Sequence, residues 1–273
     1  MHPLLTWGQA NRRDLPWRRT LDPWSVLVSE LMLQQTQVPR VLERYQPFLD
    51  RLPTLADCAA APVGDVVRLW AGLGYNRRAV NLHRTAVAVV ERHAGVLPAD
   101  LSALLALPGI GPYTARAVLC FAFEQDVVPL DVNTSRPLAR AFDLASQDAA
   151  DALVPRGAGW EWGQSLMDLG ALVCIRRSPD CVECPLAADC RWHLAGHPSP
   201  DPAAPASRQS RFEGSDRQGR GRLLDALRRG PVPLDEVAAA TGWPGDPIRA
   251  AHIAGTLVSD GLAVDRAGTL HLP

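Results

Sequence analysis

Glu30 is a single carboxylate within an otherwise apolar stretch of the chain. Pro23 and Trp24 precede it in a pattern typical of a helix start, and apolar side chains recur around it at helical spacing, namely Val26, Leu27, Leu31, Leu33 and Val38. A carboxyl group beside buried surface has a raised pKa and stays protonated near neutral pH, which suits a general acid. The pattern alone fits an ordinary exposed helical glutamate better. The other motifs of the chain favour the acid.

Asp131 offers a second carboxylate. It follows the apolar residues 127–130 and precedes a predicted helix that runs through Phe142, so it has the position of a helix N-cap. That structural role would be sufficient on its own. Beside Glu30, however, Asp131 would be a carboxylate that helix N-terminal amides keep ionised, paired with one that apolar packing keeps protonated. Such a pair is what the cleavage of a glycosidic bond needs.

Four cysteines fall within a short segment as C-x6-C-x2-C-x5-C, namely Cys174, Cys181, Cys184 and Cys190. In an intracellular protein such a group indicates a metal site rather than disulfides. Zinc is the general alternative, but the asymmetric spacing differs from paired C-x2-C knuckles and favours a [4Fe–4S] cluster. We assign the remaining Cys58 and Cys120 to core packing.

The segment 107–115 reads Leu-Pro-Gly-Ile-Gly-Pro-Tyr-Thr-Ala and separates two predicted helices, 101–105 and 115–123. Its glycines predict a hairpin whose backbone N–H groups and following helix N-terminus face outward. That geometry binds a phosphate without cationic side chains. We therefore expect DNA-backbone contacts at Gly109, Gly111, Tyr113 and Thr114.

Composition limits the possible partners. The 273 residues are 47% hydrophobic and carry a formal net charge of −1, so the chain is globular and no polybasic nucleic-acid binder. No segment approaches the ~20 apolar residues of a membrane span, and the N-terminus lacks a signal pattern. We expect a soluble, cytoplasmic, DNA-associated monomer. All 28 basic residues are arginine, so no side-chain amine can form a Schiff base.

Two loops interrupt a region, residues 4–94, whose pattern is helical throughout. The first, residues 12–19, is basic and aromatic, and Trp17 and Arg18 would lie over a site unless the loop is a solvated turn. The second, residues 72–78, reads Gly-Leu-Gly-Tyr-Asn-Arg-Arg. Its glycines would let the backbone approach a ligand and present Leu73 and Tyr75 as wedges, although a plain interhelix turn is an equal alternative.

The C-terminal third changes character. Residues 197–216 are rich in Pro, Ala and Ser and predict a linker. Beyond it, helices at 217–229, 234–241 and 247–260 and strands at 262–265 and 269–272 predict a winged-helix-like module, residues 217–273. Residues 217–229 carry five arginines and one aspartate, so the first helix would face DNA. A module that only packs against the rest is an equal alternative.

Residues 1 to about 195 closely resemble the helix-hairpin-helix DNA glycosylases, and within them the MutY adenine glycosylases. The features specific to that branch are Ser29-Glu-Leu-Met-Leu-Gln-Gln-Thr-Gln-Val38, Gly72-Leu-Gly-Tyr75 and Met167-Asp-Leu-Gly-Ala171. The resemblance implies an all-α fold of two helical subdomains with an iron–sulfur loop over residues 1–196. It also implies excision of adenine mispaired with 8-oxoguanine or guanine in double-stranded DNA.

The resemblance also assigns roles to residues. The family's catalytic acid falls on Glu30 and its catalytic aspartate on Asp131, with Tyr113 and Asn133 in support. The adenine pocket would use Trp17, Arg18 and Gln164, the wedge and opposite-base contacts would be Gln35, Thr36, Leu73 and Tyr75, and the four cysteines would hold a [4Fe–4S] cluster.

Two alternatives remain. An endonuclease III-like glycosylase-lyase on damaged pyrimidines would need a lysine in the hairpin, where Tyr113 stands. A non-catalytic DNA-binding protein would not need both Glu30 and Asp131. The chain departs from the resemblance after Cys190, where family members usually carry a larger nudix-like domain that reads 8-oxoguanine. We therefore expect a narrower preference between 8-oxoguanine and guanine.

Overall fold

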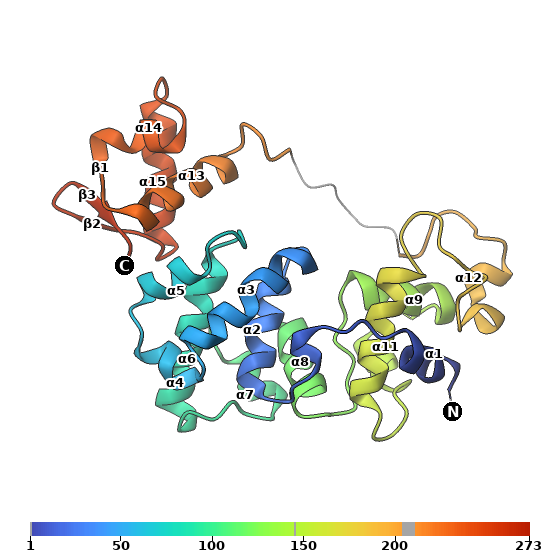
Figure 1. Ribbon diagram of the computed structural model, residues 1–273. Coiled ribbons are helices and arrows are strands. Elements are labelled where there is room, and N and C mark those ends of the chain that lie inside the picture. The colour runs from blue at the N-terminus through green and yellow to red at the C-terminus, as the bar shows by residue number, and fades with distance from the viewer. Residues whose placement is uncertain (1, 145, 204–210) are drawn as a thin grey trace. The chain divides into compact units, whose positions relative to one another are not determined.

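The structure is a computed structural model that describes residues 2–144, 146–203 and 211–273 (Figure 1). It is predominantly helical, as predicted, and it divides into two compact units. Of the described residues, the first unit comprises 2–30, 98–106, 110–144 and 146–203, and the second comprises 31–97, 107–109 and 211–273. Helix α2 (Pro23–Leu33) continues from the first unit into the second.

The first unit is built around α11 (Gly159–Leu172), against which α1 (Pro3–Asn11), α8 (Pro112–Ala122) and α9 (Val132–Phe142) pack (Figure 1). Close approach of α11 to α9 depends on Gly170, where an added Cβ would lie 2.0 Å from the carbonyl oxygen of Asn133. The remaining elements of this unit are a 3₁₀ turn at Pro16–Arg18, α7 (Leu101–Leu105), α10 (Gln147–Asp151), a 3₁₀ turn at Ala187–Asp189 and α12 (Arg191–Leu194).

The second unit contains α3 (Val38–Arg51), α4 (Leu55–Ala60), α5 (Val63–Leu69) and α6 (Arg77–His93). α6 packs against both α4 and α5. Trp70, which is fully buried, lies edge-on to Phe48 with ring centroids 5.9 Å apart. Burying such large rings contributes about 1.5–3 kcal/mol each, which fixes the loop that follows Trp70 on a rigid base.

The C-terminal residues of the second unit form α13 (Asp216–Arg229), a 3₁₀ turn at Leu234–Glu236, α14 (Val237–Thr241) and α15 (Pro247–Ser259), with a small sheet. The sheet has three strands, β1 (Val232–Pro233), β2 (Val264–Arg266) and β3 (Thr269–His271), in the order β1-β3-β2. Both neighbouring pairs are antiparallel, and Leu270 faces Val232 on one side and Asp265 on the other.

The predicted module of three helices and a wing is therefore present, but the prediction missed β1. Two residues are too short to show the alternation that marks a strand, and one of them is a proline, which is depleted in strands. The predicted linker, 197–216, falls partly on residues 204–210, which lie outside the described residues. Within the part of the chain that the structure describes, no helix combines the length and apolarity that a membrane crossing requires.

Candidate active site

Glu30 lies in α2 and is 5% exposed. The pKa of Glu30 is raised to about 7. Burial is the main cause and the charge of Asp131 also raises the pKa, while a hydrogen bond from Tyr113 and the charge of Arg18 act to lower it. The oxygen Oε2 of Glu30 has no hydrogen-bond partner among the described residues. A carboxyl with this pKa is substantially protonated at neutral pH, and its free oxygen can donate that proton to a bound group.

Asp131 caps the N-terminus of α9, as the sequence predicts. Its Oδ1 accepts hydrogen bonds from the backbone N–H groups of Asn133 and Thr134 at 2.8 and 2.9 Å, and its Oδ2 accepts one from Asn133 Nδ2 at 3.3 Å. The hydroxyl of Thr134 accepts from the backbone N–H of Asp131, which completes a capping box. These donors, at the N-terminus of the helix, fix the direction of the carboxylate.

Arg136 connects Asp131 to the cysteine segment. Its Nη2 donates to Asn133 Oδ1 at 3.1 Å, and the amide of Asn133 in turn bonds Asp131. The same guanidinium donates to the carbonyl oxygens of Cys174 and Gly170, each at 2.5 Å. Sequence reasoning did not identify Arg136, because its partners are backbone carbonyls from another helix. The orientation of Asp131 is consequently tied to the first cysteine of the segment.

Trp17 is 7% exposed, and Arg18 contacts α11 rather than solvent alone. Both terminal nitrogens of Arg18 donate to Asp168, at 2.6 and 2.9 Å. Arg13 bonds the same carboxylate through its backbone N–H at 3.1 Å and its Nε at 2.6 Å. Burial acts to raise the pKa of Asp168, but the two arginines outweigh it and hold that pKa below its ordinary value.

Asp168 is a site residue that sequence reasoning did not assign, although it stands inside the Met167–Ala171 motif. It is fully buried in α11, one helical turn beyond Gln164, which is 5% exposed. An aspartate on an apolar helix face in a chain with an arginine-rich loop is the signal that would have revealed it. Trp17 and Arg18, the two predicted pocket residues of the 12–19 loop, therefore belong to the same unit as Gln164, and Asp168 connects Arg18 to the helix of Gln164.

The hairpin at 107–115 forms between α7 and α8. Gly109 has φ +76°, and a Cβ there would lie 2.5 Å from the Cβ of Asn81, so only glycine fits. Gly111 precedes α8 with open space around it. Tyr113 is predicted both to support Glu30 and to contact the DNA backbone, and its hydroxyl bonds Glu30 in this structure. Thr114 is 2% exposed, so any contact it makes with DNA must come from its backbone N–H.

Arg78 organises the second predicted loop. Its guanidinium is 7% exposed and has hydrogen bonds from all three nitrogens. Burial lowers its pKa to about 10. Besides the hydroxyl of Thr36, at 3.0 Å, it contacts the carbonyl oxygens of Leu31, Met32, Gln34, Leu73, Gly74 and Tyr75 at 2.6–3.2 Å. It thereby joins the end of α2 to the 72–75 loop.

The residues predicted to form the wedge and the opposite-base contacts differ in exposure in this structure. Leu73 is 2% exposed, so it packs inward in this structure, and its own carbonyl and that of Gly74 are turned toward Arg78. Tyr75 is 44% exposed and has φ +44°. Gln35 is exposed with φ +55°, whereas the hydroxyl of Thr36 donates to the carbonyl of Leu73 at 3.0 Å. Gln35 and Tyr75 are the two members of the predicted set whose side chains are exposed to a ligand.

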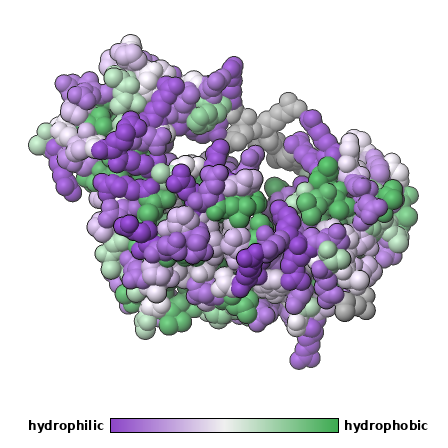
Figure 2. Space-filling model, viewed as in Figure 1, coloured by the Kyte–Doolittle hydropathy of each residue, from purple (hydrophilic) through white to green (hydrophobic). Residues whose placement is uncertain are grey.

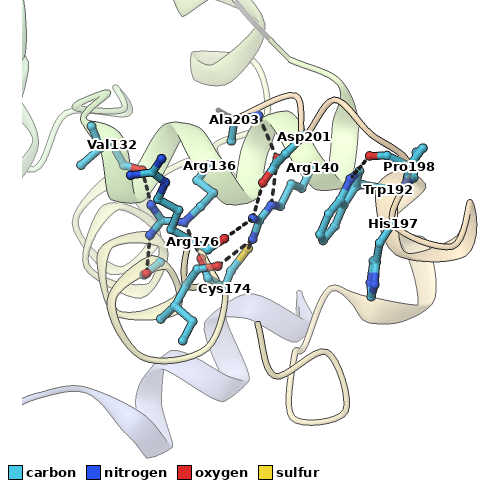
Figure 3. Close-up of polar contacts among 12 residues, drawn as sticks. Val132, Arg136, Arg140, Cys174, Arg176, Trp192, His197, Pro198, Asp201 and Ala203 are labelled. Carbon is cyan, nitrogen blue, oxygen red and sulfur yellow. Dashed lines mark hydrogen bonds and ion pairs between the residues drawn. The ribbon is translucent and has the colours of Figure 1, made fainter. Parts of the chain in front are cut away.

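The cysteine segment is fastened to α9 by Arg140, which is 2% exposed (Figure 3). Its Nη1 donates to Cys174 Sγ at 3.5 Å, and it also bonds the carbonyls of the two residues after Cys174, at 2.9 and 3.2 Å. On its other side it pairs with Asp201 at 2.5 and 3.2 Å, and its guanidinium lies 4.4 Å from the ring centroid of Trp192. The start of the predicted linker is therefore held against the cysteine segment.

The four cysteines are free and line one small cavity together with Arg140 and His193. A mononuclear zinc site would bring its sulfurs to about 3.8 Å of one another, given Zn–S bonds of ~2.3 Å. Among the described residues, the group whose ligand atoms lie within 4.8 Å is Cys181, His193 and His197, which contains one of the four cysteines. The two histidines were not predicted. A wider ring of four thiols with an N–H donor to sulfur fits a [4Fe–4S] cluster better than zinc.

Comparisons with known proteins agree with this geometry. Residues 28–155 match the HhH-GPD superfamily base excision DNA repair protein family. An adenine DNA glycosylase of Mycolicibacterium smegmatis is 42% identical over 97% of this chain and 92% of its own, and that of Homo sapiens is 39% identical over 69% of this chain and 38% of its own.

Solved structures extend the match to the fold. A thermostable thymine-DNA glycosylase superposes with a TM-score of 0.67 at 30% identity, over 71% of this chain and 94% of its own. An endonuclease III–DNA complex, at 20% identity and a TM-score of 0.60, over 71% of this chain and 94% of its own, supports the fold alone. The chain belongs to the HhH-GPD superfamily of base excision DNA repair proteins, in the branch of the adenine DNA glycosylases.

Proposed function

We propose that this protein is a monofunctional adenine DNA glycosylase that removes adenine mispaired with 8-oxoguanine or guanine. The observation that carries the proposal is Glu30, a buried carboxyl with a pKa near neutrality and one oxygen without a partner among the described residues. Its coupling to Asp131 supplies the second carboxylate that breaking a glycosidic bond needs. The 42% identical relative named adenine DNA glycosylase supports adenine as the base.

Glu30 acts as the general acid. The adenine leaves the base stack and enters the site, because chemistry on a base within the duplex is sterically blocked. Tyr113 bonds one carboxyl oxygen of Glu30, and Oε2 delivers the proton to the imidazole nitrogen of the base. Protonation turns adenine into a neutral leaving group, and the N-glycosidic bond breaks.

Asp131 stabilises the sugar that remains. Its carboxylate is fixed by Asn133 and the N-terminus of α9, so its charge faces the developing oxocarbenium ion without reorganisation. Water then adds to the sugar and gives an abasic site. No lysine is present to form an imine with the opened sugar, so strand cleavage by a lysine-dependent lyase step is not expected.

Trp17, Arg18 and Gln164 form the adenine pocket. The terminal nitrogens of Arg18 donate hydrogen bonds to Asp168. These bonds fix the guanidinium close enough to Glu30 for its charge to lower the pKa of Glu30. Trp17 offers a ring on which a flipped base stacks. On the opposite strand, we assign the contacts with 8-oxoguanine or guanine to Gln35 and Tyr75, since Leu73 is buried and Thr36 is held by Arg78.

The four cysteines would hold a [4Fe–4S] cluster, which would supply structural closure of the segment that Arg136 and Arg140 fasten to α9. Base excision transfers no electrons, so none of the proposed steps requires a redox change. The backbone of the hairpin at Gly109 and Gly111 would bind a DNA phosphate.

A glycosylase assay tests the proposal. Duplexes that carry adenine opposite 8-oxoguanine, guanine or thymine, and a duplex with an oxidised pyrimidine, are incubated with excess enzyme, and the abasic product is revealed by alkaline cleavage. We expect excision of adenine opposite 8-oxoguanine and guanine only. Release of the oxidised pyrimidine would indicate an endonuclease III-like enzyme, and no release from any duplex would indicate a non-catalytic DNA-binding protein.

The same assay measures the opposite-base preference. Single-turnover rates on the 8-oxoguanine and guanine duplexes should differ by a modest factor, because Gln35 and Tyr75, the two side chains assigned to the opposite base, supply few hydrogen bonds, each ~0.5–1.5 kcal/mol. A large rate ratio, retained after removal of residues 217–273, would contradict this expectation.

A further inference from the structure

The C-terminal module packs against α5 and the start of α6 through specific contacts. Both groups of residues fall in the second unit. Arg228 of α13 bonds the carbonyl oxygen of Val67 at 3.1 and 3.2 Å and the side-chain oxygen of Asn76 at 2.7 Å. The backbone N–H of Gly64 donates to the carbonyl of Pro273 at 3.0 Å, and a Cβ at Gly64 would lie 2.6 Å from that oxygen.

These contacts place α13 beside the exposed loop that carries Tyr75, because Asn76 is the next residue of that loop. A groove with a cavity volume of about 890 Å³ lies between them, lined by the 72–78 loop, by α13 and by Phe212 just before α13. Figure 2 shows mostly hydrophilic side chains on the visible face of the molecule, with hydrophobic residues in small separate groups. The lining of the groove itself combines charged side chains with apolar ones.

Positive charge is concentrated in this groove. Its lining holds two aspartates, Asp225 and Asp260, and six arginines, namely Arg40, Arg77, Arg78, Arg217, Arg220 and Arg228. The groove therefore carries a net charge of plus four, although the whole chain carries −1. A local excess of positive charge in an otherwise neutral protein is typical of a surface that binds a phosphate backbone.

Not all of these arginines are equally accessible. Arg78 is buried and Arg228 is half-buried in the contacts described above, and Arg220 pairs with Asp260 at 2.5 Å. Arg77 lies at the outer edge, with a 64% exposed side chain and a long 3.4 Å contact to Asp260. Arg40 is exposed, and Arg217 lies 5.9 Å from the ring centroid of Phe212. The exposed side chains of Arg40 and Arg77 can therefore reach phosphates, and Arg217 lines the same groove.

Two exposed aromatic rings accompany these arginines. Tyr75 is 44% exposed and Phe212 is 55% exposed, and both line the groove. Arginines interleaved with exposed rings suit a nucleic-acid strand, because phosphates pair with guanidinium groups while bases or sugars pack on the rings. An acidic protein surface would match the arginines but would give the two rings no planar partner.

We propose that α13 and Phe212 form, with the loop at 72–77, one groove that binds the DNA backbone next to the mispair. This inference rests on the proposed function, since a duplex whose opposite base meets Gln35 and Tyr75 must continue past the groove that shares that loop. The C-terminal module then acts as a DNA clamp that reads no base. It raises the affinity for any duplex and holds the opposite strand against Tyr75.

Binding measurements with charge-removing variants test this groove. The variant pair Arg40→Ala and Arg217→Ala is compared with Arg229→Ala and Arg266→Ala, two exposed arginines of the module that do not line the groove. All variants carry Glu30→Gln, so that the duplex with adenine opposite 8-oxoguanine is not consumed. The dissociation constant is measured by fluorescence anisotropy at a series of salt concentrations.

Each groove arginine should weaken binding by about ten-fold at fixed salt when it is replaced, as expected for a hydrogen bond to a charged group. The slope of log Kd against log salt should fall by about 0.9 for each phosphate that the variant no longer neutralises. The control pair should change neither. Phe212→Ala should weaken binding while leaving the slope unchanged, because it removes a ring and no charge.

If the groove variants bind with the wild-type constant and slope, the groove does not hold DNA, and an acidic protein surface becomes the occupant that its charge fits. The proposed function is tested separately by excision. Lost affinity in the groove variants, together with no adenine excision by the chain that retains Glu30, would support the groove and reject the function. Normal excision by the chain that retains Glu30, together with unaltered salt slopes in the groove variants, would support the function and reject the groove.

Discussion

Tyr113 donates a hydrogen bond to Glu30, and the other carboxyl oxygen of Glu30 is buried without a partner among the described residues. A buried carboxyl with half of its hydrogen-bonding capacity unused is costly to a folded protein, by about 1–3 kcal/mol for such a group. The cost is reasonable only where a ligand completes the site. Tyr113 therefore holds Glu30 through one carboxyl oxygen, and the other oxygen can donate its proton to a bound base.

Replacing Glu30 by Gln should abolish excision while leaving DNA binding intact. The amide preserves the shape and the bond from Tyr113 but has no acidic proton, so the single-turnover rate should fall by about 10²–10⁴-fold or more. Asp131→Asn should also lose orders of magnitude, through the lost charge beside the sugar. Rates on the 8-oxoguanine duplex, together with its dissociation constant, measure both effects. Excision by Glu30→Gln at the wild-type rate would remove Glu30 from its role.

Two substitutions should move the titration of Glu30 in opposite directions. Glu30 is active when protonated, so excision should fall as the pH rises through about 7. Tyr113→Phe removes a hydrogen bond that lowers the pKa of Glu30, so the fall should move to higher pH. Asp131→Asn removes a charge that raises it, so the fall should move to lower pH. Carbon-13 NMR of labelled glutamate follows the titration even where activity is low, and shifts of the same sign would contradict the arrangement.

The elements around these residues could be predicted from the sequence wherever local chemistry decides them. Asp131 is an N-cap because its side chain bonds amides two and three residues away, and α7 occupies residues 101–105 as the pattern predicts. Arg78 and Asp168 could not be assigned in this way. Their partners are carbonyls or arginines that only the fold brings together. The sequence pattern equally does not predict that the side chain of Leu73 packs inward, because this direction accompanies the contacts of Arg78 with the loop.

The raised pKa of Glu30 should also make the folded protein sensitive to pH. Because its pKa is about 7 in the folded state and about 4.5 when unfolded, protonation of Glu30 favours folding below pH 4.5, and this contribution is lost as the pH rises through 7. The difference corresponds to about 3 kcal/mol. Glu30→Gln has no such titration, so its free energy of unfolding relative to wild type should grow by that order between pH 4.5 and 8. Denaturant unfolding at several pH values measures the difference, and a constant difference would show that Glu30 is not buried in this way.

Borohydride should not trap the enzyme on DNA. Trapping requires an imine between an amine and the opened sugar, and this chain contains no lysine. We expect excision of adenine without covalent protein–DNA product, even at high enzyme concentration. A lysine-containing glycosylase-lyase provides the positive control on its own substrate. Efficient capture at a residue near the 107–115 hairpin would show that the proposed hydrolytic route is wrong.

Loss of the cysteine ligands should disturb the position of Asp131, the proposed catalytic aspartate. The purified protein should be brown and contain iron, and Cys184→Ser should lose both the iron and solubility, because metal ligation closes this segment. Arg177→Ala, at an exposed position of the same segment, should retain the iron. A colourless protein with stoichiometric zinc would reject the cluster.

Arg136→Met should keep the iron and the DNA affinity yet lower the single-turnover rate by roughly ten-fold or more, since it releases Asn133 and with it Asp131. An unchanged rate in Arg136→Met would show that Asp131 holds its direction without the cysteine segment, through the helix amides alone.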